Sequence, residues 1–113
     1  MKRRTYTCGL EAALEIAGGK WTTLVLWHLA SGPRRFGELK RLVPAISEKM
    51  LIQTLRQMQE HGIITRKDFH QVPPRVTYSL TTFGKTLTEA LRPICDWGTK
   101  HMSRIAAIGA IAE

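Results

Sequence analysis

Cysteine is scarce in this sequence, because only Cys8 and Cys95 occur among its 113 residues. Two distant cysteines cannot form the disulfide framework of a small secreted domain, which predicts a reducing compartment. Long apolar runs are also absent: the densest, residues 21–30, has half of the about 20 residues that a transmembrane helix needs. The basic residues Lys2, Arg3 and Arg4 are not followed by the apolar segment of a signal peptide. We therefore expect a cytoplasmic protein without membrane contact.

Acidic residues are also few, since 9 Asp and Glu stand against 17 Lys and Arg, which gives a formal charge of +8. Residues 34–75 hold nine of the basic residues and four of the acidic ones, so most of the excess charge lies in one segment. A surplus of this kind suggests a polyanionic partner. The 43% of hydrophobic residues is ordinary for a folded protein, and the length predicts one domain over residues 1–113.

The usual signatures of catalysis and metal binding are missing. The sequence has no His-Glu-x-x-His, no Gly-rich phosphate loop, no Cys-x-x-Cys and no credible nucleophile–base–acid set. Its four histidines show no ligand spacing and no accompanying acidic cluster. We expect neither an enzyme nor a metal site, and no cofactor. An enzyme with a dispersed site is the alternative that a turnover assay on quinones or disulfides would expose.

Hydrophobic periodicity and breaker residues predict two helices, a short helix, a further helix, a hairpin and a long helix. The helices are expected at about 10–17, 21–30, 37–42, 48–61 and from 82 onward, and the strands at 63–69 and 75–80. Short helices followed by a hairpin form the winged helix-turn-helix plan. The predicted fold class is therefore mainly α with a small β-hairpin. Its core is residues 21–80, flanked by segments 8–17 and 82–104.

Several single residues set expectations for these elements. Ser47 is a good N-cap for the fourth helix, and Gly62 is a typical residue just past its end. Leu39 and Leu42 are expected to face the core from the short helix. Pro93 lies inside the long last helix and should kink or split it.

The hairpin combines a half-buried strand with an open loop. Val76, Tyr78 and Leu80 alternate with polar residues, so we expect them to face the core. Residues 34–36 are too short for more than a turn or a stub of strand. The loop contains Pro73 and Pro74, which cannot donate to a strand ladder, and it should therefore protrude.

The helix at 48–61 has a polar face suited to reading DNA. At the helical repeat, Lys49, Gln53 and Arg56 share one stripe. Leu51, Leu55 and Met58 lie on the opposite side. Arg, Lys and Gln are the residues that bond base edges in the major groove. Any amphipathic surface helix can carry such residues, but the position between a short helix and a basic hairpin favours DNA binding.

Basic and polar residues also gather around the hairpin loop, namely Arg66, Lys67, His70, Gln71 and Arg75. An arginine on a protruding loop can reach phosphates or enter a narrow minor groove. Across the whole segment, the residues expected to contact double-stranded DNA are Arg35, Lys40, Ser47, Lys49, Gln53, Arg56, Lys67, Gln71 and Arg75.

Six segments between about residues 8 and 102 carry a family resemblance. They are Cys8, Gly18-Gly19-Lys20-Trp21, Gly32-Pro33-Arg34-Arg35-Phe36, Ile46-Ser47-Glu48-Lys49-Met50-Leu51, Val72-Pro73-Pro74-Arg75-Val76-Thr77-Tyr78-Ser79-Leu80-Thr81 and Trp97-Gly98. In order and spacing they resemble the HxlR-type transcriptional regulators, a winged-helix family related to MarR-type regulators. Two positions depart from the family pattern. Gly37 stands where the family usually has a Ser or Asn N-cap, and Pro93 lies about a turn later than the family's proline.

The resemblance implies a homodimer that joins through its first and last helices and regulates transcription, expected as a repressor, from a pseudo-palindromic operator. The residues also favour a dimer, because the helix at 82–102 is apolar on more than one face. Residues 103–113 could extend the interface or fray. The expected interface residues are Leu10, Leu14, Leu87, Leu91, Ile94 and Trp97.

Cys8 is the candidate redox or electrophile sensor. It precedes the first helix and follows Lys2, Arg3 and Arg4, and helix N-termini and cations stabilise the reactive thiolate. Cys8 also matches the N-terminal cysteine with which HxlR-type regulators often sense oxidants. The alternative is a helix-entry residue with no regulatory role. Cys95 has apolar neighbours, so we expect a packing role, with a resolving thiol as the alternative.

Other readings remain open at this stage. Trp21, Trp27 and Trp97 are expected in the core or the dimer interface, and a pocket between them could admit a small apolar or electrophilic effector. The fold could instead serve as a protein-interaction module, or bind DNA without regard to sequence and without sensing.

Overall fold

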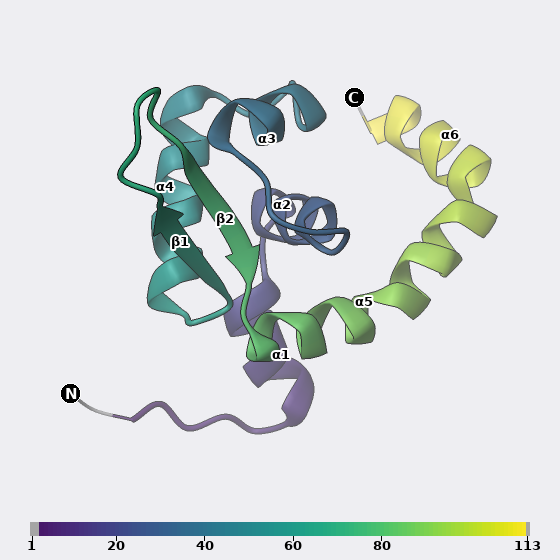
Figure 1. Ribbon diagram of the computed structural model, residues 1–113. Coiled ribbons are helices and arrows are strands. Elements are labelled where there is room, and N and C mark those ends of the chain that lie inside the picture. The colour runs from purple at the N-terminus through teal and green to yellow at the C-terminus, as the bar shows by residue number, and fades with distance from the viewer. Residues whose placement is uncertain (1–2, 113) are drawn as a thin grey trace.

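The computed structural model describes residues 3–112 and has the predicted winged helix-turn-helix architecture (Figure 1). Its elements are α1 (Gly9–Ala17), α2 (Lys20–Leu29), α3 (Phe36–Leu42), α4 (Glu48–Glu60), β1 (Ile64–Asp68), β2 (Val76–Leu80), α5 (Thr82–Lys100) and α6 (Met102–Ala112). The predicted order and fold class, mainly helical with one antiparallel hairpin, are confirmed. Within the described residues, no helix is both long enough and apolar enough to cross a bilayer.

The core forms around α2, which contacts α3, α4, α5 and β2. Val25, Leu26 and Leu29 line its buried side. The other fully or nearly fully buried apolar residues are Leu39, Val43, Ile46, Leu51, Leu55, Met58, Ile63 and Ile64. Burial of such side chains is the main stabilising term of a small domain. The apolar side of α4 is therefore buried against α2.

Both ends of α4 are defined by hydrogen bonds. The Ser47 hydroxyl oxygen accepts from the Met50 backbone N–H at 3.1 Å, which confirms the predicted N-cap. At the other end, the Ile63 N–H donates to the Met58 carbonyl and the Gly62 N–H to the Gln59 carbonyl. These bonds form a Schellman motif, and Gly62 adopts the positive φ of 73° that this motif requires. The chain therefore leaves α4 in a fixed direction and enters β1 at once.

The hairpin pairs β1 with β2 in a register that joins Ile64 to Leu80 and Asp68 to Val76. Arg34 adds a predicted stub of strand, since it exchanges backbone hydrogen bonds of 3.0 and 2.8 Å with Tyr78.

The expected alternation along β2 holds in part. Tyr78 and Leu80 pack against the core as expected, but Thr77, which was expected on the polar side, is buried. Arg34 and β1 pair with the two edges of β2, and α2, α3 and α5 also contact the strand, so none of its five residues is exposed.

Two expectations for α3 are also wrong. The helix begins earlier than predicted, so Gly37 lies inside it and Arg35 is the N-cap, with its N–H donating to the Glu38 carboxylate at 3.0 Å. Leu42 is exposed rather than buried. It ends a helix of only two turns, and Val43 and Ile46 fill the core beyond that end instead.

The last helix does not split at Pro93. Helix α5 continues through it to Lys100, and the helical path breaks at His101, after which α6 folds back (Figure 1). A proline removes one backbone donor, and the remaining hydrogen bonds of a 19-residue helix offset that loss. The segment that was expected to join an interface or fray is helical as far as Ala112, and Glu113 lies outside the described residues.

The start of α5 is attached to the turn between α4 and β1. The Thr81 N–H donates to the Ile63 carbonyl at 3.1 Å, and the Thr81 hydroxyl donates to the Gly62 carbonyl at 2.6 Å. The contact is so close that a Cβ on Gly84 would lie 2.1 Å from the Ile63 carbonyl oxygen. A side chain at position 84 would therefore push α5 away from α4 and β1.

We predict that Gly84→Ala lowers the free energy of unfolding by about 1–3 kcal/mol, as overpacking does. Gly37→Ala is the matched control, because its Cβ would meet only the end of the Arg41 side chain at 3.8 Å. An alanine in this helix should leave the free energy of unfolding unchanged or raise it by up to about 1 kcal/mol. Urea unfolding at equal protein concentration measures both. Equal midpoints for the two variants would contradict the close approach.

Candidate nucleic-acid interface

The polar side of α4 is free on the surface. Lys49, Gln53 and Arg56 are all exposed, while Leu51, Leu55 and Met58 on the opposite side are buried. The amphipathic division predicted from the spacing is therefore present in the fold. The helix N-terminus with Ser47 is exposed at one end of this stripe and adds unpaired backbone N–H groups and a partial positive charge.

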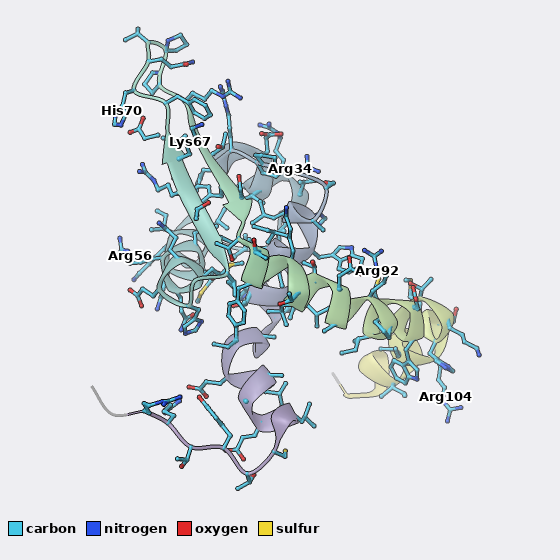
Figure 2. The ribbon with its side chains drawn as sticks, turned by 60° about the horizontal axis from the view of Figure 1, so that its bottom comes forward. Arg34, Arg56, Lys67, His70, Arg92 and Arg104 are labelled. Carbon is cyan, nitrogen blue, oxygen red and sulfur yellow. The ribbon has the colours of Figure 1, made fainter. Side chains whose placement is uncertain are left out.

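The hairpin projects beyond the helical body and carries charge near its free end (Figure 2). Lys67 and His70 are labelled there, and Arg56 of α4 lies on the same side of the molecule. The loop is closed by a 2.9 Å hydrogen bond from the Phe69 N–H to the Arg75 carbonyl. Val72, at the tip, is 98% exposed. The predicted protruding loop is confirmed.

An aromatic ring organises the cations of the loop. Lys67 Nζ lies 4.6 Å from the centroid of the Phe69 ring, and the Arg75 guanidinium carbon lies 4.3 Å from it. Cation–π contacts of this kind contribute roughly 0.5–1 kcal/mol each at exposed sites. Both residues stay exposed, as does Gln71, so the ring limits their motion without neutralising their charge.

Two of the basic residues near α3 have internal partners. Arg34 donates to the His28 carbonyl at 3.2 Å and to the Ser31 hydroxyl at 2.9 Å, so it braces the turn after α2. Lys40 donates to the Pro44 carbonyl at 3.2 Å and is half-buried. Arg35, in contrast, is exposed at the start of α3.

A hollow of about 220 Å³ lies between α4 and the hairpin. Its lining consists of Ile52, Leu55, Arg56, Gln59, Arg66 and Tyr78. The sequence placed Arg66 with the loop cluster and gave it no site of its own. The cross-strand register, which sets Arg66 opposite Tyr78 over α4, is the signal that reveals its position.

Exposed apolar side chains are concentrated on α1, α5 and α6. They include Leu10, Leu14, Phe83, Ile94, Trp97, Met102, Ile105 and Ile108. Of the expected interface residues, Leu87 and Leu91 are half-buried against the chain's own core, and the other four are exposed. A soluble fold rarely leaves this much apolar surface uncovered.

Cys8 occupies the N-cap of α1 and is exposed. Arg4 forms an ion pair with Glu15, and the Thr7 hydroxyl donates to Glu11 at 2.5 Å, so this segment is held along α1. The Arg4 charge expected to act on Cys8 is therefore shared with a carboxylate. Lys2, also expected to act on it, lies outside the described residues.

The expected packing role of Cys95 is wrong, because its side chain is exposed. It lines an apolar groove of about 310 Å³ between α2 and α5, together with Thr23, Leu24, Trp27, Leu91 and Ile94. Of the three tryptophans that could border an effector pocket, only Trp27 lines this groove. Trp97 is exposed and packs against His101, with the rings tilted by 44° and their centroids 4.9 Å apart.

Within residues 3–112, no three His, Cys, Asp or Glu side chains are grouped so that they could hold a metal ion.

Comparison with known proteins connects this architecture to transcription. The model of the HxlR-like helix-turn-helix family matches residues 16–106. YkvN, an HTH-type transcriptional regulator of Bacillus subtilis, is 48% identical over 106 residues, which cover 94% of this chain and 90% of the relative.

Solved structures agree with this result. The redox regulator HypR in its reduced form has 37% identity and a TM-score of 0.82, covering 88% of this chain and 99% of its own. The reduced transcriptional regulator YodB of Bacillus subtilis has 31% identity and a TM-score of 0.73, covering 82% and 92%.

These relatives are regulators rather than enzymes. With its helix-turn-helix fold and a match over most of its length, this chain belongs to the HxlR-like family of transcriptional regulators.

Proposed function

We propose that this regulator binds double-stranded DNA as a homodimer, with α4 in the major groove and the hairpin loop at the adjacent phosphates or minor groove. The observation that carries the proposal is the exposed stripe of Lys49, Gln53 and Arg56 beside a projecting loop whose cations are arranged around Phe69. Lysine, arginine and glutamine bond base edges, and exposed cations bond phosphates. Arg35, Lys40 and Ser47 would add backbone contacts, and Gln71 a polar contact from the loop.

The apolar residues on α1, α5 and α6 support the dimer, since a second copy would cover them. A two-fold axis through this region would present two copies of α4 to successive major grooves, about 34 Å apart. The operator would then be pseudo-palindromic. Bound across a promoter, such a dimer would act as a repressor.

Cys8 would link DNA binding to oxidants or electrophiles. Its exposed position at the N-cap of α1 places a thiol on an element of the proposed dimer interface. Oxidation there would alter the spacing of the two α4 helices. Cys95, exposed in the groove between α2 and α5, is the candidate resolving thiol, and the same groove would take a small apolar or electrophilic effector.

The DNA proposal predicts a strong dependence on salt. Affinity for the duplex that flanks the chain's own gene should fall by roughly a thousandfold or more between about 50 and 200 mM salt, because several phosphate contacts release counterions. Fluorescence anisotropy against an unrelated duplex of equal length measures it. A flat response would favour a protein-interaction module, and equal affinity for the two duplexes would favour binding without sequence preference.

Substitutions should separate base contacts from phosphate contacts. Gln53→Ala should change the base preference in a binding-site selection, because a bidentate Gln–adenine contact contributes about 1–3 kcal/mol of discrimination. Arg75→Ala should weaken binding to all duplexes and lower the salt slope by about 1 if it meets phosphate. Arg104→Ala is the matched control, since Arg104 lies on α6 at the opposite end of the molecule from the hairpin loop (Figure 2). An unchanged selection profile would remove Gln53 from the reading surface.

The thiol proposal predicts that Cys8→Ser binds DNA normally but no longer loses affinity with diamide. Diamide accepts the two electrons and two protons that are released when two thiols join as a disulfide. Cys95→Ser is the companion variant: it should also become insensitive if Cys95 resolves Cys8, and stay sensitive if the two Cys8 residues join. Gel shifts and non-reducing gels measure both. A wild-type protein that ignores diamide would contradict the sensor role.

A further inference from the structure

The hollow between α4 and the hairpin has the composition of an anion site. Its lining combines Arg56 and Gln59 from α4 and Arg66 from β1 with Ile52, Leu55 and Tyr78. None of its lining residues is acidic. We propose that Arg56 and Arg66 together hold one phosphate of the DNA backbone in this hollow, with Gln59 as an additional donor. The inference rests on the proposed DNA binding and assigns a contact within it.

The fold positions the two guanidinium groups from different elements. Arg66 lies opposite Tyr78 in the β1–β2 register, so the two side chains share the face of the hairpin that covers α4. Tyr78 is half-buried and packs on the core, so the residue opposite Arg66 in the sheet is held in place. Arg56 reaches the same hollow from α4, whose other side is locked in the core.

The charges of the hollow are unbalanced. Neither Arg56 nor Arg66 forms an ion pair within residues 3–112, whereas Arg34 and Arg92 each have a carboxylate partner there. Glu60 lies one turn from Arg56 on α4 and makes no ion pair with it. Two cations around one hollow repel each other unless an anion lies between them. Two guanidinium forks also match the oxygens of a phosphate better than lysine does.

The position of the hollow identifies the anion as a backbone phosphate. With α4 in the major groove and the loop at the neighbouring minor groove, the sugar–phosphate strand that separates the two grooves must cross the space between them. That space is occupied by the hollow. Arg56 is therefore assigned to the backbone and not to a base, although it lies on the same stripe as Lys49 and Gln53.

The test compares Arg66→Gln, Arg56→Gln and the double variant with Arg104→Gln, an exposed arginine on α6 outside the hollow. Affinity is measured by anisotropy for the operator duplex and an unrelated duplex at several salt concentrations. Each single variant should lose roughly tenfold in affinity, by the same factor on both duplexes, as expected for a charged hydrogen bond. The double variant should lose the salt dependence of one phosphate, a slope of about 0.9 per protomer. Arg104→Gln should bind like wild type.

Each remaining outcome contradicts the shared site. If the salt dependence of the double variant fell by the equivalent of two phosphates per protomer, the two arginines would bind separate phosphates. Wild-type affinity in Arg66→Gln would exclude Arg66 from the contact. A changed base preference in Arg56→Gln would return Arg56 to the bases. These failures are distinct from failure of DNA binding itself, which would appear as a wild-type protein that binds neither duplex at low salt.

A free phosphate is the other source of the same chemistry. Inorganic phosphate is therefore added to the wild-type complex, and a chloride salt without sulfate is used to keep the ionic strength constant. Weak competition with DNA that depends on Arg66 is expected, because both ligands would occupy the same hollow. Phosphate that binds the free protein through Arg66 but leaves the affinity for DNA unchanged would overturn the assignment to DNA.

Discussion

The packing of the apolar side of α4 against α2 is the contact on which the other features of this protein depend. Leu51, Leu55 and Met58 are almost fully buried there, in the same core cluster as Val25 and Leu26 of α2. Because a helix presents its opposite sides at once, burial of this face decides which residues of α4 meet solvent. The stripe of Lys49, Gln53 and Arg56 is exposed for that reason.

The same contact is carried into the hairpin and the last helix. The Schellman motif at Gly62 ends α4 and directs the chain into β1, and Thr81 and Gly84 then bring the start of α5 onto the backbone of residues 62 and 63. Helix α4, the hairpin with its loop, and helix α5 of the proposed dimer interface are thus all attached to the short turn at residues 62 and 63. A change in the angle of α5 would be transmitted to α4 through few and rigid contacts.

Charge is distributed less simply than the net value of +8 suggests. Arg34 and Lys40 lie in the most basic segment, yet both donate to backbone carbonyls of their own chain. Lys67 and Arg75 lie over the Phe69 ring and keep their charge accessible. Arg56 and Arg66 lie around one hollow without a carboxylate. Within the described residues, the donors of these last two groups have no backbone acceptor of that kind, so they are available to a polyanion together with the exposed Lys49 of α4.

The sequence by itself determined the order of the elements, the caps of α4, the two faces of that helix and the protruding loop, because each follows from local periodicity, a capping residue or a proline. It misplaced Cys95 and Leu42, it allowed for a split at Pro93 that α5 does not show, it expected Thr77 on the polar side of β2, and it assigned Arg66 no place beyond the loop cluster. Those features depend on residues distant in the chain: α2 forms the second wall of the groove at Cys95, Val43 and Ile46 fill the space beyond α3, and Arg34 covers the free edge of β2. Local pattern specifies what a residue can do, whereas contacts between distant segments decide which surface it meets.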